Sequence, residues 1–207
     1  MAPGDRLPAE REFAVELGVA RPTLRQALKV LQEEGYVCVR RGAAGGTFVS
    51  ELQIPLEQWF EYIRSHMAEF DDILDYRQAV EAHAAYLAAQ RRDQDDLDVM
   101  EAALSSLLTA GSRALFRQAD SRFHNAIGRA SRSPRLERAI RTARGEFFFP
   151  TDKLYYKEQV EVAHKGHVAV FTAIRDQDAE EAARRMADHI ETARGELYEI
   201  VLRIEAR

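Results

Sequence analysis

The stretch PAEREFAVELGVARPTLRQALKVLQEEG, from Pro8 to Gly35, holds two amphipathic runs with a turn between them. Apolar residues of the first run recur at helical spacing until Gly18 breaks the pattern. The second run has apolar residues at i, i+3, i+4 and i+7, namely Leu24, Ala27, Leu28 and Leu31. Its cations recur every four residues on another face, namely Arg21, Arg25 and Lys29. The pattern predicts a helix-turn-helix whose second helix can offer cations to a phosphate backbone.

A basic, glycine-rich hairpin is predicted directly after this second helix. Gly35 is a typical helix stop, and short β-type runs at 36–40 and 47–49 flank the segment 41–46. Two helices followed by such a hairpin indicate a winged helix-turn-helix. In that arrangement the second helix enters the major groove and the wing contacts the neighbouring backbone or minor groove.

The remainder of the chain predicts helices only, so the expected fold class is mostly α. We expect a winged helix-turn-helix DNA-binding domain at 1–50, a linker at 51–55, and an all-α antiparallel bundle at 56–207. Breaks at Gly111, Pro134, Pro150 and Gln177 separate the bundle helices. The predicted helices are 56–66, 70–91, 94–109, 113–131, 134–147, 154–176 and 178–205.

Charge is distributed unevenly between these two parts. Residues 1–50 contain seven Lys or Arg against six Asp or Glu, and residues 51–207 contain 22 against 28. The net charge is therefore +1 for the first part and −6 for the second. A small basic surface on an otherwise acidic protein is compatible with local contact to DNA. No apolar run reaches membrane-spanning length and no signal peptide is visible, which predicts a soluble cytoplasmic protein.

Four side chains in the bundle have a spacing that suits a metal ion. Asp120 and His124 lie one turn apart on one helix face, and His167 and His189 are 22 residues apart across the break near Gln177. Because those two helices run antiparallel, both imidazoles should lie at a similar height. Three nitrogens and one carboxylate oxygen suit Zn²⁺ or Ni²⁺ by affinity, with Mn²⁺ possible by availability.

Spacing alone leaves other interpretations open. An Asp-x3-His pair is commonly a surface ion pair, and scattered histidines usually have ordinary surroundings. His164 competes with His167 for the third ligand position, and we choose His167 because it keeps the antiparallel match to His189. His66 and His83 have no convergent partners and are expected to be structural or exposed.

The sequence resembles a known family at both ends. PGDRLPAERE, GVARPTLRQAL and RRGAAGGTFV are similar to the amino-terminal domain of GntR-type bacterial repressors. DSRFHNAIGRAS and HVAVFTAIRDQDAEEAARRMADHI resemble the metal-binding effector domain of the FadR branch, called the FCD domain. The resemblance implies a homodimeric, metabolite-responsive regulator, and it strengthens the assignment of the four residues as metal ligands.

The resemblance also implies residues that contact DNA and a first helix that this sequence lacks. Residues 3–7 correspond to the loop before the family's second helix, so we expect a marginally packed DNA-binding domain. The positions that match the family's DNA contacts are Arg11, Arg21, Thr23, Arg25, Arg41 and Gly42.

For the effector, the resemblance implies a small carboxylate, a hydroxy acid or sugar acid, bound at open positions on the metal. Arg77 matches a family position with a cation near the metal, and its alternative role is an i, i+4 pair with Glu81 on the helix surface. Lys153, Tyr155 and Tyr156 are further pocket candidates.

Three rival functions remain: a metalloenzyme with an appended winged domain, a regulator with a purely structural metal, and a metal-free pocket for an acyl chain. The enzyme reading is disfavoured because the sequence contains neither HExxH nor the paired Glu-x-x-His motifs of di-iron bundles.

Overall fold

The computed structural model describes residues 5–33, 36–42, 45–50, 56–111, 113–146 and 156–205. The chain divides into two compact units, Met1–Ile54 and Pro55–Arg207, which we call the winged unit and the helical unit. The fold is mostly α, as predicted from the sequence. The predicted linker, residues 51–55, lies outside the described residues.

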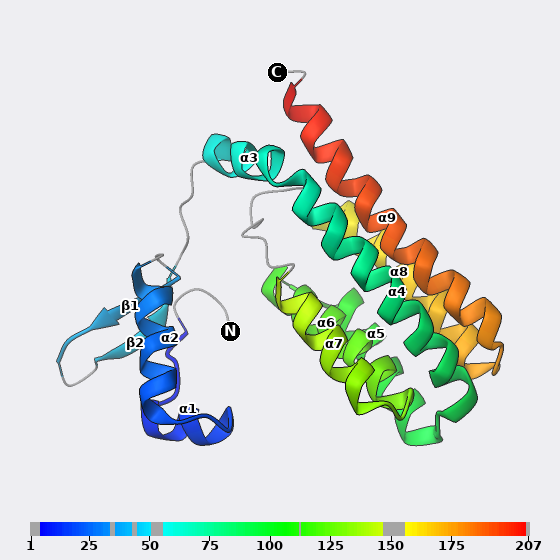
Figure 1. Ribbon diagram of the computed structural model, residues 1–207, viewed down its shortest axis with the longest axis horizontal. Coiled ribbons are helices and arrows are strands. Elements are labelled where there is room, and N and C mark those ends of the chain that lie inside the picture. Colours follow the sequence, from blue (N-terminus) through cyan, green and yellow to red (C-terminus); the bar gives the residue numbers. More distant parts are fainter. Residues whose placement is uncertain are drawn as a thin grey trace. The chain divides into compact units, whose positions relative to one another are not determined.

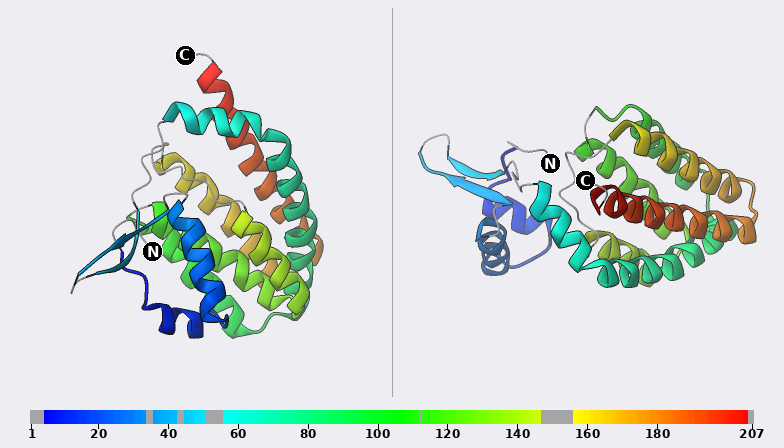
Figure 2. Two further views of the ribbon diagram at one scale, coloured as in Figure 1. Left: turned by 60° about the vertical axis from the view of Figure 1, so that its left-hand side comes forward. Right: turned by 90° about the horizontal axis from the view of Figure 1, so that it is seen from above.

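The winged unit contains the predicted helix-turn-helix and hairpin. Helix α1, Glu10–Glu16, leads through Gly18 into α2, Arg21–Glu33. Gly18 has a φ of +66°, a left-handed conformation that glycine adopts without a steric penalty. Strands β1, Val37–Arg40, and β2, Gly46–Val49, pair antiparallel and extend away from the helices of this unit (Figure 2).

A third segment pairs with the hairpin at the edge of β2. Arg6 bridges Phe48, the amide of Leu7 donates to the carbonyl of Thr47 at 2.8 Å, and the amide of Val49 donates to the carbonyl of Asp5 at 2.9 Å. From the sequence, this segment was expected to be part of a loop. It is short and contains Arg and Asp, so only the ladder hydrogen bonds reveal its extended pairing.

The winged unit buries fewer apolar side chains than the apolar pattern of its sequence suggests. Among the residues of this unit that the structure describes, the buried apolar side chains are Leu7, Ala14, Leu24 and Val37. Of the predicted apolar stripe on α2, Leu24 is buried and Leu28 half-buried, whereas Ala27 and Leu31 are exposed. Within the described residues of this unit, α2 packs against α1 and β1, which cover one side of the helix.

The helical unit contains the seven predicted helices, with ends within a few residues of the expected positions (Figure 1). They are α3 (Leu56–Ser65), α4 (Met67–Arg91), α5 (Gln94–Leu108), α6 (Arg113–Ala130), α7 (Pro134–Glu146), α8 (Tyr156–Arg175) and α9 (Ala179–Glu205). Helix α4 begins at Met67 rather than residue 70, because the amide of Phe70 already bonds to the carbonyl of His66 at 3.1 Å. Among the described helices, none has the length and apolar character needed to cross a membrane.

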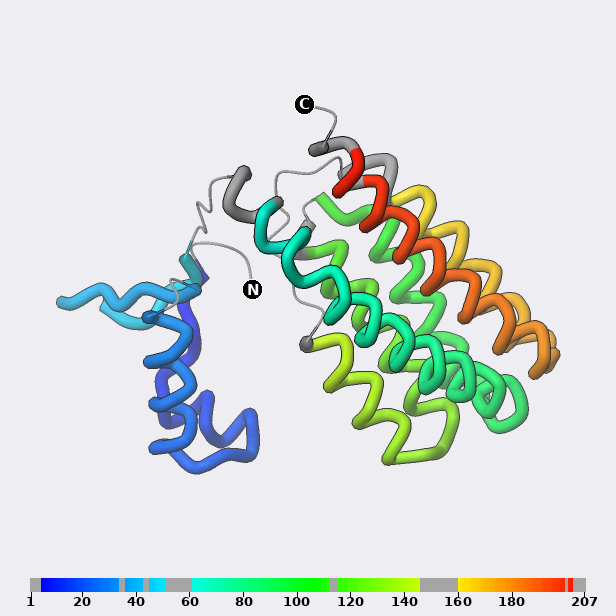
Figure 3. Tube along the Cα trace, turned by 45° about the horizontal axis from the view of Figure 1, so that its top comes forward, coloured from blue at the N-terminus to red at the C-terminus, as the bar shows by residue number. Residues whose placement is uncertain are grey.

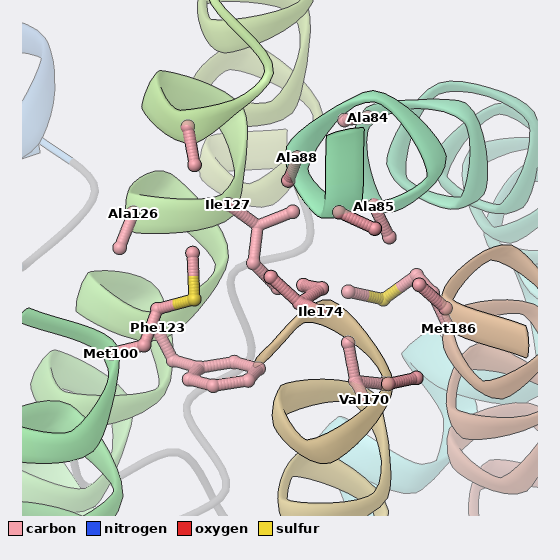
Figure 4. Packing of buried hydrophobic residues seen from close by; sticks show 14 of the residues in the cluster. Ala84, Ala85, Ala88, Met100, Phe123, Ala126, Ile127, Val170, Ile174 and Met186 are labelled. Carbon is pink, nitrogen blue, oxygen red and sulfur yellow. The ribbon is translucent and has the colours of Figure 1, made fainter. Parts of the chain in front are cut away.

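The core of the helical unit lies between α4, α5, α6, α8 and α9. Helix α4 packs against α9 and α6, and α8 runs beside α9 (Figure 3). Phe123, Ile127, Ile174 and Met186 meet in the interior, as Figure 4 shows. The alanines of α4, whose role the sequence left open, pack closely there, namely Ala84, Ala85, Ala88 and Ala89. Small side chains let the neighbouring helices approach α4 closely.

A polar network away from this core ties α5 to the end of α6. Asp93 and Asp96 form a capping box at the start of α5, which satisfies free amides of its first turn. Asp96 is 2% exposed and also pairs with Arg129 at 3.3 Å and Arg132 at 2.7 Å. The two guanidinium groups offset the cost of burying this carboxylate.

Candidate metal centre

Four side chains from three helices converge inside the helical unit: Asp120 and His124 from α6, His167 from α8, and His189 from α9. One nitrogen or oxygen atom from each lies within 4.8 Å of the others. The Nε2 atoms of His124 and His167 are 3.0 Å apart, and Oδ1 of Asp120 lies 3.1 Å from the His167 Nε2. The ring centres of His167 and His189 are 4.2 Å apart. The structure thus brings all four predicted ligands together.

The helices position these groups by register. One helical turn separates Asp120 from His124, so both face the same side of α6. The α8–α9 turn passes through Gln177, which has a φ of +60°, and reverses the chain so that His167 and His189 lie at matching heights. Apolar contacts between the same two helices, including Ile174 and Met186, hold that register.

Gly166 allows His189 to approach the backbone of α8. A Cβ atom at this position would lie 2.6 Å from Nδ1 of His189, well inside van der Waals contact. Any other residue at 166 would therefore push the imidazole out of its place. This glycine was not predicted from the sequence, although its position next to His167 in HKGH is the signal that could have suggested it.

A buried carboxylate supports His124 from behind. Oε2 of Glu81, on α4, makes a short contact with Nδ1 of His124, and Oε1 accepts a hydrogen bond from Nε of Arg77 at 2.7 Å. Glu81 is 0% exposed and Arg77 5%. The predicted pair between Arg77 and Glu81 is present, but it is buried instead of lying on the helix surface.

Asp120 is supported in a similar way. Its Oδ2 atom is paired with the guanidinium of Arg144 on α7, while Oδ1 faces His124 and His167. The Nε atom of Arg144 is buried and has no hydrogen-bond partner among the described residues. Each oxygen of Asp120 therefore has a separate role, one toward the imidazoles and one toward the cation.

The electrostatics of the cluster favour ionised carboxylates at Asp120 and Glu81 and neutral imidazoles at His167 and His189. Burial raises the pKa of Asp120, but Arg144, His124 and His167 outweigh it and hold that pKa well below its ordinary value. For Glu81, burial is likewise outweighed by Arg77 and His124, so its pKa is also lowered. Burial lowers the pKa of His167 and, together with the two neighbouring imidazoles, that of His189. These are the protonation states in which such groups coordinate a cation.

The other predicted pocket residues are placed less directly. Arg77 is paired with Oε1 of Glu81, whose other oxygen contacts His124. Lys153 and Tyr155 lie outside the described residues, as does the side chain of Tyr156, the first residue of α8. Of the remaining histidines, His164 and His66 are half-buried and His83 is exposed, and none belongs to the cluster.

The predicted DNA contacts lie on the winged unit and are solvent-accessible. Arg11 is exposed on α1, and Arg21, Thr23 and Arg25 are exposed on the first turns of α2. Arg25 pairs with Glu10 of α1 at 2.7 Å. At the wing, Arg41 and Gly42 are exposed, and Gly42 has a φ of +112°, a conformation that glycine adopts readily.

Sequence reasoning missed Glu81 and Arg144 as parts of the centre. Glu81 follows Leu74 by seven residues on α4, and Arg144 follows Ile140 by four on α7. Both therefore fall on the buried stripe of their helix, where an unpaired charge is costly. A charge at a core position was the signal that each would have a buried partner.

Replacement of Gly166 by alanine is expected to weaken metal binding by about tenfold or more, because the added methyl displaces His189. The matched control is Gly195→Ala in α9, where nothing lies within 4 Å of the added carbon. That change should leave metal affinity intact and stabilise the helix by about 0.5–1 kcal/mol. The Zn²⁺ affinity of both variants is measured by chelator-competition titration. Equal affinities for Gly166→Ala and wild type would contradict the assigned place of His189.

Metal-free protein is expected to lose stability as the pH falls below about 6.5. His167 and His189 have lowered pKa values in the folded chain, so the unfolded chain binds more protons in that range. Asp120 and Glu81 also have lowered pKa values, and the stability they contribute above about pH 4.5 is lost in more acidic solution.

Urea midpoints in the presence of chelator at pH 8, 6.5 and 5.5 measure this dependence. A His167→Gln/His189→Gln double variant should show a shallower decline between pH 6.5 and 5.5 than wild type. A wild-type midpoint that is constant over the whole interval would refute the neutral, buried state of the two imidazoles.

The fold and the site together define a class of protein: a winged DNA-binding unit joined to a helical unit with a partly buried His₃Asp cluster. The profile described as "Bacterial regulatory proteins, gntR family" matches residues 1–49, and the FCD domain profile matches residues 72–192. The chain belongs to the GntR family of bacterial transcriptional regulators and carries an FCD domain, in agreement with the sequence-based prediction.

Two similar proteins share about a third of the sequence. The "Putative HTH-type transcriptional regulator RmpR" of Mycobacterium gastri is 32% identical over 90% of this chain and 70% of its own length. The "Putative L-lactate dehydrogenase operon regulatory protein" of Escherichia coli K12 is 33% identical over 90% of this chain and 76% of its own. Both are named as regulators rather than enzymes, which agrees with the expectation from the motifs.

Solved structures share the fold. E. coli McbR/YncC is 21% identical over 96% of this chain and 89% of that chain, with a TM-score of 0.59. A GntR-family transcriptional regulator from Pseudomonas syringae pv. tomato is 17% identical over 99% of this chain and 80% of that chain, with a TM-score of 0.54.

Proposed function

We propose that this regulator senses a small carboxylate through a divalent metal held by Asp120, His124, His167 and His189, and that the bound acid changes its affinity for operator DNA. The convergence of four donor atoms within 4.8 Å carries the proposal. Two of these groups, His124 and His167, are buried, and polar groups are costly to bury without a partner such as a common cation.

The donor set fits a divalent ion. Donors that share one ion at about 2.0–2.2 Å lie at most about 4.4 Å apart, so the cluster would need movements of less than an ångström. Oδ1 of Asp120 and Nε2 of His124 and His167 already face one another. Three imidazoles and one carboxylate favour Zn²⁺, with Ni²⁺ next by affinity and Mn²⁺ by availability.

The effector class follows from the chemistry that such a metal supplies. A cation with four protein ligands can accept further oxygen donors, and a 2-hydroxy acid or sugar acid offers a carboxylate and a hydroxyl as a chelating pair. The name of the E. coli relative refers to an L-lactate dehydrogenase operon, which is compatible with a 2-hydroxy acid. Arg77, and Lys153, Tyr155 and Tyr156 near the start of α8, are proposed as further effector contacts.

On the DNA side, we propose that the protein acts as a homodimeric repressor. Two copies related by a twofold axis would place two α2 helices in successive major grooves of a palindromic operator. The proposed contacts are Arg11, Arg21, Thr23, Arg25, Arg41 and Gly42. One group of relatives carries the name "HTH-type transcriptional repressor NanR", at 26% identity, which supports the choice of repression. An effector that prefers one arrangement of the two winged units would shift operator affinity.

A thermal-shift screen of hydroxy and sugar acids tests the sensing proposal. The screen compares Zn²⁺-loaded protein with chelator-stripped protein, each with L-lactate, D-lactate, glycolate and D-gluconate. At least one acid is expected to raise the melting temperature of the loaded protein only, because a ligand that binds the folded state alone stabilises it by mass action. Equal shifts with and without the metal would contradict metal-mediated recognition, and no shift with the loaded protein would contradict this effector class.

A further inference from the structure

Glu81 is a buried acid that is not among the candidate metal ligands. It lies in the middle of α4 in the apolar segment that supplies Ala84, Ala85 and Ala88 to the core. It is 0% exposed, and its two oxygens contact groups on different helices. Oε1 accepts from Arg77 one turn earlier on α4, and Oε2 contacts Nδ1 of His124 on α6. A carboxylate so placed bridges a fixed cation and a candidate metal ligand.

We propose that Glu81 is a positioning residue for the metal centre, which holds His124 in the tautomer that presents an unprotonated Nε2 to the ion. The inference rests on the proposed metal-binding function and adds a residue to it. Arg77 takes part by fixing Glu81 through the hydrogen bond that its Nε donates to Oε1.

The two nitrogens of a neutral imidazole have different roles. One nitrogen carries a proton and donates, and the other has a lone pair and accepts. An ionised carboxylate can only accept, so Nδ1 of His124, facing Glu81, must be the protonated nitrogen. Nε2 then has the lone pair. This atom faces the other donors, at 3.0 Å from the His167 Nε2 and 3.7 Å from Oδ1 of Asp120.

The geometry also explains why the acid is paired with Arg77. A lone carboxylate buried at this depth would take up a proton, and a neutral acid could donate to Nδ1 and reverse the tautomer. The hydrogen bond from Arg77 Nε, 2.7 Å long, favours the charged form instead. Metal-bound histidines generally have such an outer carboxylate or carbonyl, which orients the ring and raises its basicity.

A purely structural role for the Arg77–Glu81 pair is the competing explanation, and three variants separate the two. Glu81→Gln removes the charge at nearly constant volume. Arg77→Met/Glu81→Gln removes both charges and leaves no unpaired buried cation. Asp96→Asn is the matched control, because Asp96 is also a buried carboxylate between guanidinium groups but pairs with Arg129 and Arg132. Metal-free stability and Zn²⁺ affinity are measured for each variant by urea denaturation and chelator competition.

Glu81→Gln is expected to lower Zn²⁺ affinity by about 10- to 100-fold. The double variant should regain stability relative to Glu81→Gln while its Zn²⁺ affinity stays low. Asp96→Asn should lose stability and keep its affinity. Recovery of affinity together with stability in the double variant, or an unchanged affinity in Glu81→Gln, would overturn the positioning role. Wild-type protein that fails to bind Zn²⁺ would instead contradict the metal centre itself, and the positioning role with it.

A second readout does not depend on metal. In histidine ¹⁵N-labelled, metal-free wild type at pH 8, two-bond ¹H–¹⁵N correlations should show His124 protonated at Nδ1, with its signals assigned by their loss in His124→Asn. In Glu81→Gln the Nε2-protonated form should become populated. A wild-type His124 protonated at Nε2 would overturn the proposal whatever the affinities are.

Discussion

Replacement of His167 by alanine is expected to weaken Zn²⁺ binding by about 100- to 1,000-fold. A four-ligand zinc site contributes about 10–16 kcal/mol of binding free energy, so one ligand accounts for about 2.5–4 kcal/mol on average. His167 is 0% exposed, and its Nε2 atom faces both His124 and Asp120, so no other group can easily take its place. Zn²⁺ should then no longer raise the melting temperature of the variant at concentrations that saturate the wild type.

The matched control for this variant is His164→Ala. His164 lies one turn earlier on α8, is half-buried and does not belong to the cluster. It was also the rival for the third ligand position from the sequence. Removal of the His164 imidazole should leave Zn²⁺ affinity within about twofold of wild type, since substitutions of exposed or half-exposed residues away from a site have small effects. A larger loss for His164→Ala than for His167→Ala would reverse the ligand assignment. Metal-free stability of both variants is measured separately, because alanine at 167 also leaves a cavity.

The second large effect is expected at the DNA surface. A DNA duplex is first selected from a pool of random sequences by its binding to the full chain. At fixed salt, the Arg21→Ala/Arg25→Ala double variant should bind this duplex with an affinity lower by about 30-fold or more. Each arginine that contacts a base edge contributes about 1–3 kcal/mol of binding free energy. Each arginine that contacts a phosphate changes the slope of log affinity against log salt concentration by about one. Both side chains are exposed on the first turns of α2, where a recognition helix approaches base edges.

Binding isotherms at several salt concentrations distinguish base reading from phosphate contact. Arg184→Ala is the matched control, because Arg184 is an exposed, ion-paired arginine of α9 in the helical unit. It should change neither affinity nor slope. Glu10→Ala, which releases Arg25 from its 2.7 Å ion pair, should not weaken binding. Unchanged affinity and slope in the double variant would show that α2 is not the helix that contacts DNA.

Much of the metal cluster could be predicted because it follows from helix geometry. The four-residue spacing of Asp120 and His124 and the distances of His167 and His189 from one turn are properties of regular helices. The antiparallel match to His189 then selected His167 over His164, and the resemblance to the family strengthened the assignment of all four ligands. Nothing in that reasoning required knowledge of how α4 and α7 pack.

The supporting residues could not be predicted in the same way, because they depend on contacts between helices far apart in sequence. Glu81 and His124 are 43 residues apart, and Arg144 reaches Asp120 across 24 residues. A sequence pattern identifies Arg77 and Glu81 as an i, i+4 pair. Only the packing of α4 against α6 shows that the pair is buried and that its second oxygen meets an imidazole.

Similar limits applied to the winged unit. Gly18 and the β-type runs predicted the turn and the hairpin, since local backbone preferences determine both. The pairing of Asp5 and Leu7 with β2 involves residues some 40 positions apart and no hydrophobic alternation. The exposure of Ala27 and Leu31 was also unforeseen, because the apolar stripe of α2 is wider than the surface that α1 and β1 cover.

Anomalous scattering tests the central claim most directly. Crystals of the full chain grown with Zn²⁺ would be measured on both sides of the zinc absorption edge. The account predicts one strong peak in the helical unit, about 2.0–2.2 Å from a nitrogen of each of His124, His167 and His189 and from an oxygen of Asp120. A map with no peak among these four side chains, or with zinc bound only elsewhere on the protein, would contradict it.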